Sequence, residues 1–314
     1  FPGVEVGGSS SMKSSNIGGQ AVMEGVMMRN ADKYAVAVRK TDGEIVVKTE
    51  EYKGIVQNKK IRSLPIIRGV FSFIDSMVLG MSTLTYSASF FMDEEEEEKD
   101  EKKDSVMMGL TIACSVVMAV AIFMILPYFL SQLFRKFTDS TTLITLLEGA
   151  VRLVIFFGYI LLISRMKDIQ RVFMYHGAEH KCINCIEHGM ELNVENVLKS
   201  SRLHKRCGTS FLFIVMIVSI IFFLFIRIES PIWRVVFRLL LIPVIAGVSF
   251  EFIRLAGKSE NKLVIFLSKP GMMLQKLTTR EPDASMAEVA IASVEAVFDW
   301  RAYLKENFGW QEKV

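Results

Sequence analysis

Long apolar runs separated by polar segments dominate this sequence. Four runs are close to the ~20 residues that a helix needs to cross a bilayer; they span residues 106–134, 143–163, 211–228 and 235–252. We expect Pro127 to kink or end the first run, because proline removes a helical hydrogen bond. The pattern predicts an α-helical integral membrane protein with about four transmembrane helices.

A fifth apolar stretch, residues 64–92, carries a polar stripe. Arg68 and Asp75 are seven residues apart and so share one helical face, which Ser72 and Ser82 roughly continue. A helix with such a stripe is typical of the membrane interface or of packing against a bundle. We therefore predict an interfacial amphipathic helix, followed by a solvated acidic linker at 93–104.

The segment before this helix predicts a small β unit. Asp42-Gly43 separates two runs rich in β-branched residues, 34–39 and 44–48, which is a strong hairpin signal. Residues 17–28 hold three glycines and are interpreted as a tight turn that enters a strand. Residues 1–11 are Gly/Ser-rich and precede Met12, so we interpret them as a tag remnant or a disordered tail.

The tail predicts two further helices. An amphipathic stretch at 263–277 is interrupted by Pro270-Gly271, and a second helix begins at Pro282-Asp283. The chain therefore divides, in order, into a β unit (12–62), an amphipathic helix and linker (63–105), a first transmembrane pair (106–164), a polar island (165–207), a second transmembrane pair (208–254) and a helical tail (255–314).

Charge predicts the orientation. Lys and Arg are concentrated in 12–62, 165–207 and 255–314, whereas the two other loops hold few. The positive-inside rule places the three basic segments, and both termini, on the cytoplasmic side of the plasma membrane. If 64–92 also crossed the bilayer, the basic β unit would lie outside, so four spans are favoured.

Composition supports a multi-span protein and limits the partners. Half of the 314 residues are hydrophobic (51%), and the net charge is only +3. The basic residues form no patch interleaved with aromatic residues, so we expect no nucleic acid partner. The expected partners are the lipid bilayer and a protein at the cytoplasmic face. The four cysteines suggest reduced thiols or metal ligands.

The polar island concentrates metal-ligand side chains. We expect one helix from 168 to 188, ended by Gly189. On it His180 lies about 40° from His176 around the axis, and Glu187 lies about 20° from His176. Two imidazoles four residues apart can bind one ion, and His176-x-x-Glu179-His180 matches the inverted zincin pattern, with the glutamate as general base.

The third ligand is left open between His204 and Cys207. Three protein ligands and a water make a catalytic zinc site, whereas four protein ligands make a structural one. Glu187 could orient a histidine from behind, and Glu24 and Arg29 could face the island from the glycine-rich segment.

A competing zinc ribbon is also left open. Cys182, Cys185, His204 and Cys207 have the spacing of a structural Cys3His site. Cys185 lies about 180° from His176 on one helix, so the ribbon requires the helix to break near Lys181.

Three motifs resemble a known family. They read GGQAVMEGVMMR (18–29), YHGAEHK (175–181) and SRLHKRCGTS (201–210), and they are similar to those of the YqhQ-like family of bacterial membrane proteins. The resemblance runs from about Gly18 to the C-terminal helix and implies a metal-dependent enzyme. The motif positions of that family that this sequence matches are His176, Glu179, His180, His204 and Cys207. Cys182 and Cys185 lie outside its usual pattern.

We predict a zinc-dependent hydrolase, with zinc or another divalent metal held by His176, His180 and either His204 or Cys207. Glu179 is expected to act as general base on water. One alternative is a non-catalytic membrane scaffold or biogenesis factor.

A transporter is a further alternative. It would need Glu148, Arg152 and Arg238 to face a solvated path. Glu148 and Arg152 are four residues apart in the second span, and we interpret them as a pair that neutralises itself.

Overall fold

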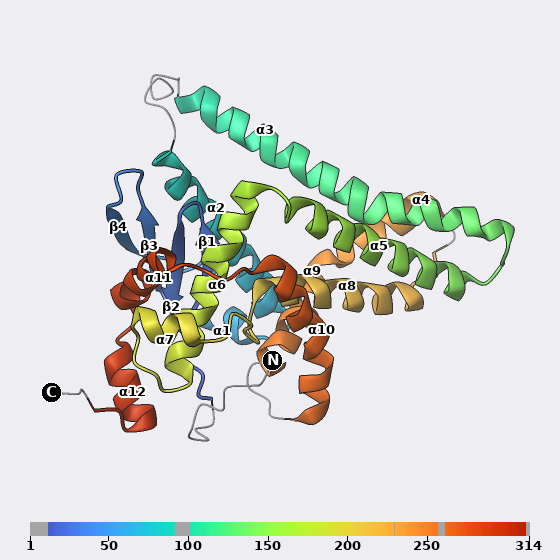
Figure 1. The fold of residues 1–314 in the computed structure, drawn as a ribbon. Helices are drawn as coiled ribbons and strands as arrows, with labels where there is room; N and C mark the ends of the chain where they lie inside the picture. The colour runs from blue at the N-terminus through green and yellow to red at the C-terminus, as the bar shows by residue number, and fades with distance from the viewer. Residues whose placement is uncertain (1–11, 92–100, 229, 257–260, 312–314) are drawn as a thin grey trace.

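The computed structural model describes residues 12–91, 101–228, 230–256 and 261–311. Residues 1–11, interpreted as a tag remnant or a disordered tail, and residues 92–100, which include most of the predicted acidic linker, lie outside the described residues. A four-stranded sheet with helices packed on it forms one part of the molecule, and long apolar helices extend from it to one side (Figure 1). We call the first part the head; it comprises β1–β4, α6, α7, α11 and α12.

The sheet is an antiparallel meander in chain order. Its strands are β1 (Gly18–Val22), β2 (Gly25–Asn30), β3 (Lys33–Arg39) and β4 (Ile45–Glu51). The predicted hairpin is confirmed, since Arg39 of β3 is paired with Ile45 of β4 across a turn in which Gly43 has a φ of 90°. The glycine-rich segment forms a second hairpin, β1–β2, where we predicted only a turn into one strand.

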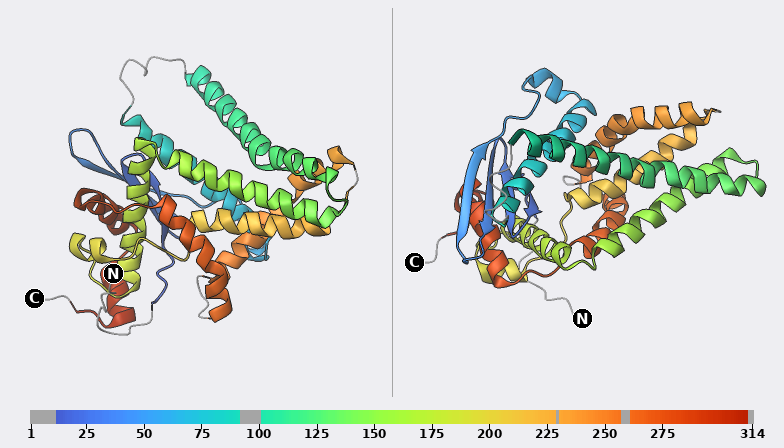
Figure 2. Two further views of the ribbon diagram at one scale, coloured as in Figure 1. Left: turned by 45° about the vertical axis from the view of Figure 1, so that its right-hand side comes forward. Right: turned by 90° about the horizontal axis from the view of Figure 1, so that it is seen from above.

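Both faces of the central strands β2 and β3 are buried, because successive residues of their continuous apolar runs point to opposite faces, whereas β4 is largely exposed. One face packs on Leu79 of α2 (Ile67–Ser89). The opposite face packs on α6 (Lys167–Glu187) and α11 (Ala284–Val297). The head is therefore a sheet between helices. Within it, α6 contacts the sheet at strands β1 and β2 (Figures 1 and 2).

Among the described residues, five helices are long and apolar enough to cross a membrane. Four are the predicted spans: Gly109–Lys136, which comprises most of α3 (Glu101–Val120) together with α4 (Leu126–Gln132), then α5 (Thr141–Ile163), α8 (Gly208–Phe225) and α9 (Pro231–Ala256). The chain is thus a multi-pass membrane protein, as predicted. The first span continues through Pro127, preceded by a π-helical turn at Ala121–Ile125, a local irregularity that accommodates helix kinks.

The fifth candidate is α2, which we predicted at the interface. Arg68 near its start forms an ion pair of 2.5 Å with Glu251 near the end of α9. Phe73 lies 5.5 Å, ring to ring, from Phe211 near the start of α8, and Leu79 packs under the sheet. These contacts place α2 across the ends of α8 and α9 that are nearest to the head, which supports the interfacial position.

The spans alternate in direction. The end of α5, the start of α8 and the end of α9 all meet the head, and the loops at 137–140 and 226–228 lie at the opposite end (Figure 2). The three basic segments therefore lie at one end of the bundle, as four spans require. That this end faces the cytoplasm remains a prediction.

The tail forms α10 (Lys262–Thr278), α11 and α12 (Trp300–Phe308). The predicted interruption at Pro270 is wrong, because α10 runs through it. Proline removes one helical hydrogen bond, and α10 stays packed across that point: Gly271 lies against Ser210 of α8, and Leu274 is buried. α11 begins where predicted, with Asp283 Oδ1 accepting from the Met286 N–H at 2.9 Å. Two short helices, α1 (Lys59–Ser63) and α7 (Val194–Lys199), complete the structure.

Candidate metal centre

One uninterrupted helix, α6, carries both candidate histidines. It runs to Glu187, and Gly189 beyond it has a φ of 77°, the left-handed geometry of a helix C-terminus. His176 and His180 lie on the same face, with ring centroids 4.4 Å apart. The predicted helix is confirmed, and the break near Lys181 that the ribbon needs is absent.

Backbone carbonyl groups orient the two imidazoles. Nδ1 of His176 is 2.9 Å from the carbonyl oxygen of Thr278, and Nδ1 of His180 is 2.7 Å from that of Arg202. Since a carbonyl can only accept, each Nδ1 carries the hydrogen. In the neutral form of each ring, Nε2 therefore keeps its lone pair for a metal ion, an arrangement common behind metal-binding histidines.

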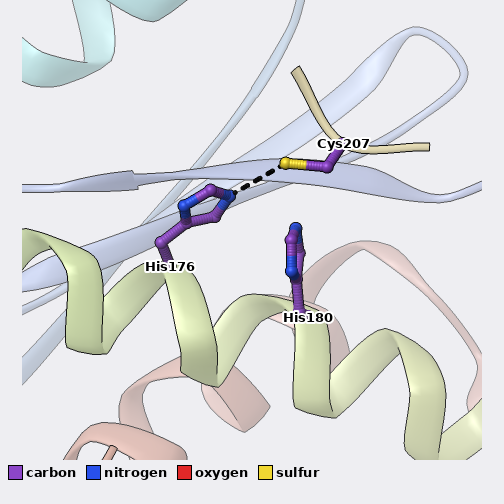
Figure 3. A group of neighbouring side chains, drawn as sticks. All are labelled: His176, His180 and Cys207. Carbon is purple, nitrogen blue, oxygen red and sulfur yellow. Dashed lines mark hydrogen bonds between the residues drawn. The ribbon is translucent and has the colours of Figure 1, made fainter. Parts of the chain in front are cut away.

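Cys207 meets these histidines from the start of a membrane helix. It is the N-cap of α8, and its Sγ accepts from the Thr209 N–H at 3.4 Å. Sγ lies 3.3 Å from Nε2 of His176, and the three ligand atoms of His176, His180 and Cys207 all lie within 4.8 Å of one another (Figure 3). This is the group in the described residues that could hold a metal ion.

The three groups shift one another's protonation. Burial disfavours the charged form of His176, but the Cys207 thiolate and the Glu179 carboxylate outweigh it and raise the pKa of His176 to about 9. Burial would also keep Cys207 protonated, yet the charges of His176 and His180 hold its pKa well below the usual value. The site thus presents a thiolate, which is the form of cysteine that binds metals.

Glu179 lies beside the group. Its Oε2 is 3.9 Å from Nε2 of His176 and 3.8 Å from Nε2 of His180, and its side chain is only 5% exposed. A Cβ on Gly19 of β1 would lie 3.1 Å from Glu179 Cγ, so the first strand covers this carboxylate. His176 keeps 17% of its side chain exposed and is the most accessible of the four side chains.

His204 points elsewhere. Its ring centroid is 5.7 Å from that of His180, and its Nε2 lies 3.4 Å from Glu187 Oε2. Of the two candidates for third ligand, the geometry favours Cys207. Glu187 contacts a histidine, as predicted, but this histidine is His204, which lies outside the group of His176, His180 and Cys207.

Glu187 also joins three segments of the chain. It accepts from the N–H and the hydroxyl of Ser15 at 2.7 and 2.8 Å, and Arg206 Nη2 donates to it at 2.5 Å. Burial would raise its pKa, but His204 and Arg206 outweigh burial and lower it. This buried anion fixes the end of α6 to the segment before α8.

Glu24 and Arg29 do not reach the group of three. Glu24 forms an ion pair with Arg171 of α6 and accepts from the Tyr175 hydroxyl at 3.3 Å. Arg29 stacks over the Tyr52 ring at 5.4 Å. Glu24 therefore contacts α6 at residues that precede His176. Arg29 contacts Tyr52, which packs on the face of the sheet that α2 covers.

The ribbon cysteines lie in the apolar core. Cys182 and Cys185 are fully buried among the residues that join α6, α11 and the sheet. Burial raises the pKa of Cys185 to about 12. They are neutral core thiols away from the group, so the ribbon has no support in this structure.

Several supporting residues were missed by sequence reasoning. Gln275 is fully buried; its Oε1 accepts from the His204 N–H at 2.8 Å, and its Nε2 donates to the His204 carbonyl at 2.7 Å. The contacts of the imidazoles with the carbonyls of Thr278 and Arg202 cannot be predicted from residue types, because every residue has a backbone carbonyl. The pair of glycines at 18 and 19 is the one available signal, because Gly19 stands where a side chain would press on Glu179.

Comparison with known proteins agrees with the motifs. The family model described as "Protein of unknown function (DUF1385)" matches residues 64–300. The "Uncharacterized protein YqhQ" of Bacillus subtilis (strain 168) is 36% identical over 301 residues, 92% of this chain and 94% of that protein. No solved structure matches. The family match and the extent of this identity show that the chain belongs to the DUF1385 family of membrane proteins.

Proposed function

We propose that this protein is a zinc-dependent hydrolase whose active site is the group of His176, His180 and Cys207 at the junction of head and spans. The observation that supports this most is the convergence of two imidazole nitrogens and a thiolate on one point, with the Glu179 carboxylate beside both nitrogens.

The donor set fits zinc. Zinc binds imidazole nitrogen at ~2.0–2.1 Å and thiolate at ~2.3 Å in tetrahedral sites, so the nitrogen and the sulfur are expected about 3.6 Å apart. The distance of 3.3 Å between His176 Nε2 and Cys207 Sγ is close to that value. Two histidines and one cysteine leave the fourth position of a tetrahedron for water or substrate.

Each side chain has a role in this proposal. His176, His180 and Cys207 would hold the ion, and the carbonyls of Thr278 and Arg202 keep the neutral imidazoles in the ligating tautomer. When bound, zinc would supply Lewis acidity and make water more acidic, toward a pKa of ~7. Glu179 accepts the proton of the attacking water at Oε2 and returns it to the leaving group.

We place the site on the cytoplasmic side of the bacterial plasma membrane. The basic segments 12–62, 165–207 and 255–314 share the end of the bundle that carries the group, and the positive-inside rule assigns that end to the cytoplasm. Substrates would reach the ion past His176, from the membrane surface.

The test combines metal analysis, spectroscopy and turnover of Glu179→Gln. The variant should keep its zinc and lose hydrolysis of a panel of nitrophenyl esters and phosphates by ~100-fold or more. In the cobalt-substituted wild type, visible absorption should change with pH near ~7 as the coordinated water ionises. Glu195→Gln, an exposed glutamate of α7, is the matched control and should change nothing. Loss of the metal from Glu179→Gln would count against the role as base.

A non-catalytic scaffold is the second candidate, and burial favours it. Glu179, His180 and Cys207 are all nearly inaccessible to solvent. If Glu179 were a fourth ligand, the site would be closed and structural. The cobalt spectrum would then be independent of pH near neutrality, and Glu179→Gln would weaken metal binding.

A further inference from the structure

A second site of charged residues lies at the end of the bundle opposite to the head. A cavity of about 470 Å³ opens there between α4, α5 and α9. Four arginines are among its lining residues, Arg135, Arg227, Arg234 and Arg238, and Glu148 is the one acidic residue among them. The cavity is therefore strongly basic, and it lies at the end of the bundle away from the metal centre.

The floor of this cavity holds an uncompensated buried charge. The Glu148 carboxylate accepts from Arg152 Nη2 at 2.9 Å, which confirms the predicted pairing, and it also accepts from Arg238 Nη1 at 2.5 Å. All three side chains are at most 7% exposed. Two guanidinium groups share one carboxylate, so among the residues that the structure describes one positive charge is left over inside the bundle, where an unbalanced charge is costly and usually functional.

One donor of this cluster is also unused. Arg152 donates to Glu148 and, through Nη1, to the Ser219 hydroxyl at 2.9 Å. Its Nε is buried and has no hydrogen-bond partner among the described residues. A buried donor without an acceptor costs about 1–3 kcal/mol, and Arg152 lines the apolar groove described below, so the polar cluster is incompletely satisfied on the groove side.

Two long helices direct their N-termini to the same cavity. Thr141, the first residue of α5, and Pro231, the first residue of α9, both line it. The N-terminus of a helix carries a partial positive charge and favours bound anions. The helix ends therefore reinforce the arginines.

An apolar groove of about 370 Å³ adjoins the cluster from within the bundle. Arg152, Ser219 and Phe223 line it together with aliphatic and aromatic side chains of α5, α8 and α9. The Arg238 guanidinium lies 4.5 Å from the Phe223 ring centroid, and the charged cluster therefore borders both the basic cavity, through Glu148 and Arg238, and the apolar groove, through Arg152. A basic cavity next to an apolar groove suits a molecule with an anionic head and a hydrocarbon chain.

We propose that this site binds an anionic phospholipid, with its phosphate among Arg227, Arg234 and Arg238 and one acyl chain in the groove. The phosphate supplies the negative charge that the buried cluster lacks. The site lies at the bundle end away from the metal centre, so it is independent of the proposed hydrolysis.

The test uses the full chain purified in a neutral detergent. Thermal unfolding is followed while phosphatidylglycerol, phosphatidylcholine with the same chains, glycerophosphoglycerol without chains, or inorganic phosphate is added. Phosphatidylglycerol should raise Tm in a saturable manner. Arg227→Ala/Arg234→Ala should weaken its binding about tenfold or more, because charged hydrogen bonds are lost. Should the double variant not fold, Arg227→Ala alone, an exposed residue of the site, is used instead and should still weaken binding of phosphatidylglycerol; unchanged binding would contradict the proposal.

Lys136→Ala is the matched control, because Lys136 is exposed at the same end but does not line the cavity. It should bind phosphatidylglycerol as the wild type does. Equal binding of phosphatidylcholine, equal loss in Lys136→Ala, or equal affinity for glycerophosphoglycerol or inorganic phosphate would each overturn the proposal of a lipid site.

Discussion

The Sγ of Cys207 lies 3.3 Å from Nε2 of His176, and this contact joins the start of a membrane helix to a helix of the head. The two residues are brought together because α6 packs on one face of the sheet and the segment before α8 lies against α6, where the carbonyl of Arg202 contacts His180. A metal ion held here would link the soluble and membrane parts of the molecule.

Cys207→Ser tests this link. We expect zinc affinity to fall by more than ~100-fold, since groups that merely support ligands already contribute ~10–100-fold. Competition with a chelator measures the change. Cys114→Ser, an exposed cysteine of α3, should bind zinc as tightly as the wild type; unchanged affinity in Cys207→Ser would remove Cys207 from the ligand set.

The metal-free protein should show a pH signature of this pair. The pKa of His176 is raised from 6.5 to about 9, so its contribution to stability is complete below 6.5 and is lost as the pH rises through about 9. The pKa of Cys207 is lowered from 9.0, so its contribution is complete above 9.0 and is lost as the pH falls. The pKa of His180 is raised as well, so above about 6.5 the losses from the two histidines oppose the gain from Cys207.

The measurement is Tm of zinc-free wild type minus that of zinc-free Cys207→Ser as a function of pH. Because Cys207 also raises the pKa of both histidines, this difference in Tm includes their titration. The same two samples are therefore compared by ultraviolet absorption of the thiolate, which should persist in the wild type well below pH 9.0. A thiolate signal that disappears as the pH falls through 9.0 would show that Cys207 is an ordinary thiol in the folded protein.

Gly19→Ala should disturb the site from the sheet side. An added Cβ would collide with the Met27 carbonyl and approach Glu179 Cγ to 3.1 Å. We expect a loss of about 1–3 kcal/mol in unfolding free energy, as for other overpacked positions, together with an altered cobalt spectrum. Gly18→Ala is the control, because its Cβ would meet nothing within 4 Å. If the two variants behave alike, β1 does not constrain Glu179.

The interfacial position of α2 can be tested by cysteine labelling in membrane vesicles. Leu64→Cys, just before α2, and Ser89→Cys, at its end, should react with an impermeant maleimide from the same side. Asp139→Cys, in the loop between α4 and α5, should react from the other side. Labelling of positions 64 and 89 from opposite sides would make α2 a fifth span.

The elements with local signals were predictable from the sequence. The β3–β4 hairpin follows from Asp42-Gly43, α6 from the position of Gly189 and the spacing of His176 and His180, and the start of α11 from Asp283. Each signal lies within one or two helical turns of what it predicts. The continuation of α10 through Pro270 was not predictable, because it depends on packing against α8, which is not a local property.

The choice between His204 and Cys207 was not predictable. Both lie in one short segment with suitable ligand chemistry. Their directions depend on Gln275, which is 71 residues from His204 and holds its backbone through two hydrogen bonds. This leaves the His204 ring facing Glu187 and Cys207 facing His176. No spacing rule contains that information.

The central claim is that His176 and His180 bind a metal ion. The most direct test is elemental analysis of the purified full chain, wild type against His176→Ala/His180→Ala, with His188→Ala as control because its ring is exposed at the end of α6. We predict one zinc per chain in wild type and in His188→Ala, and none in the double variant. A wild type without metal, or a double variant that retains the same amount, would contradict the account.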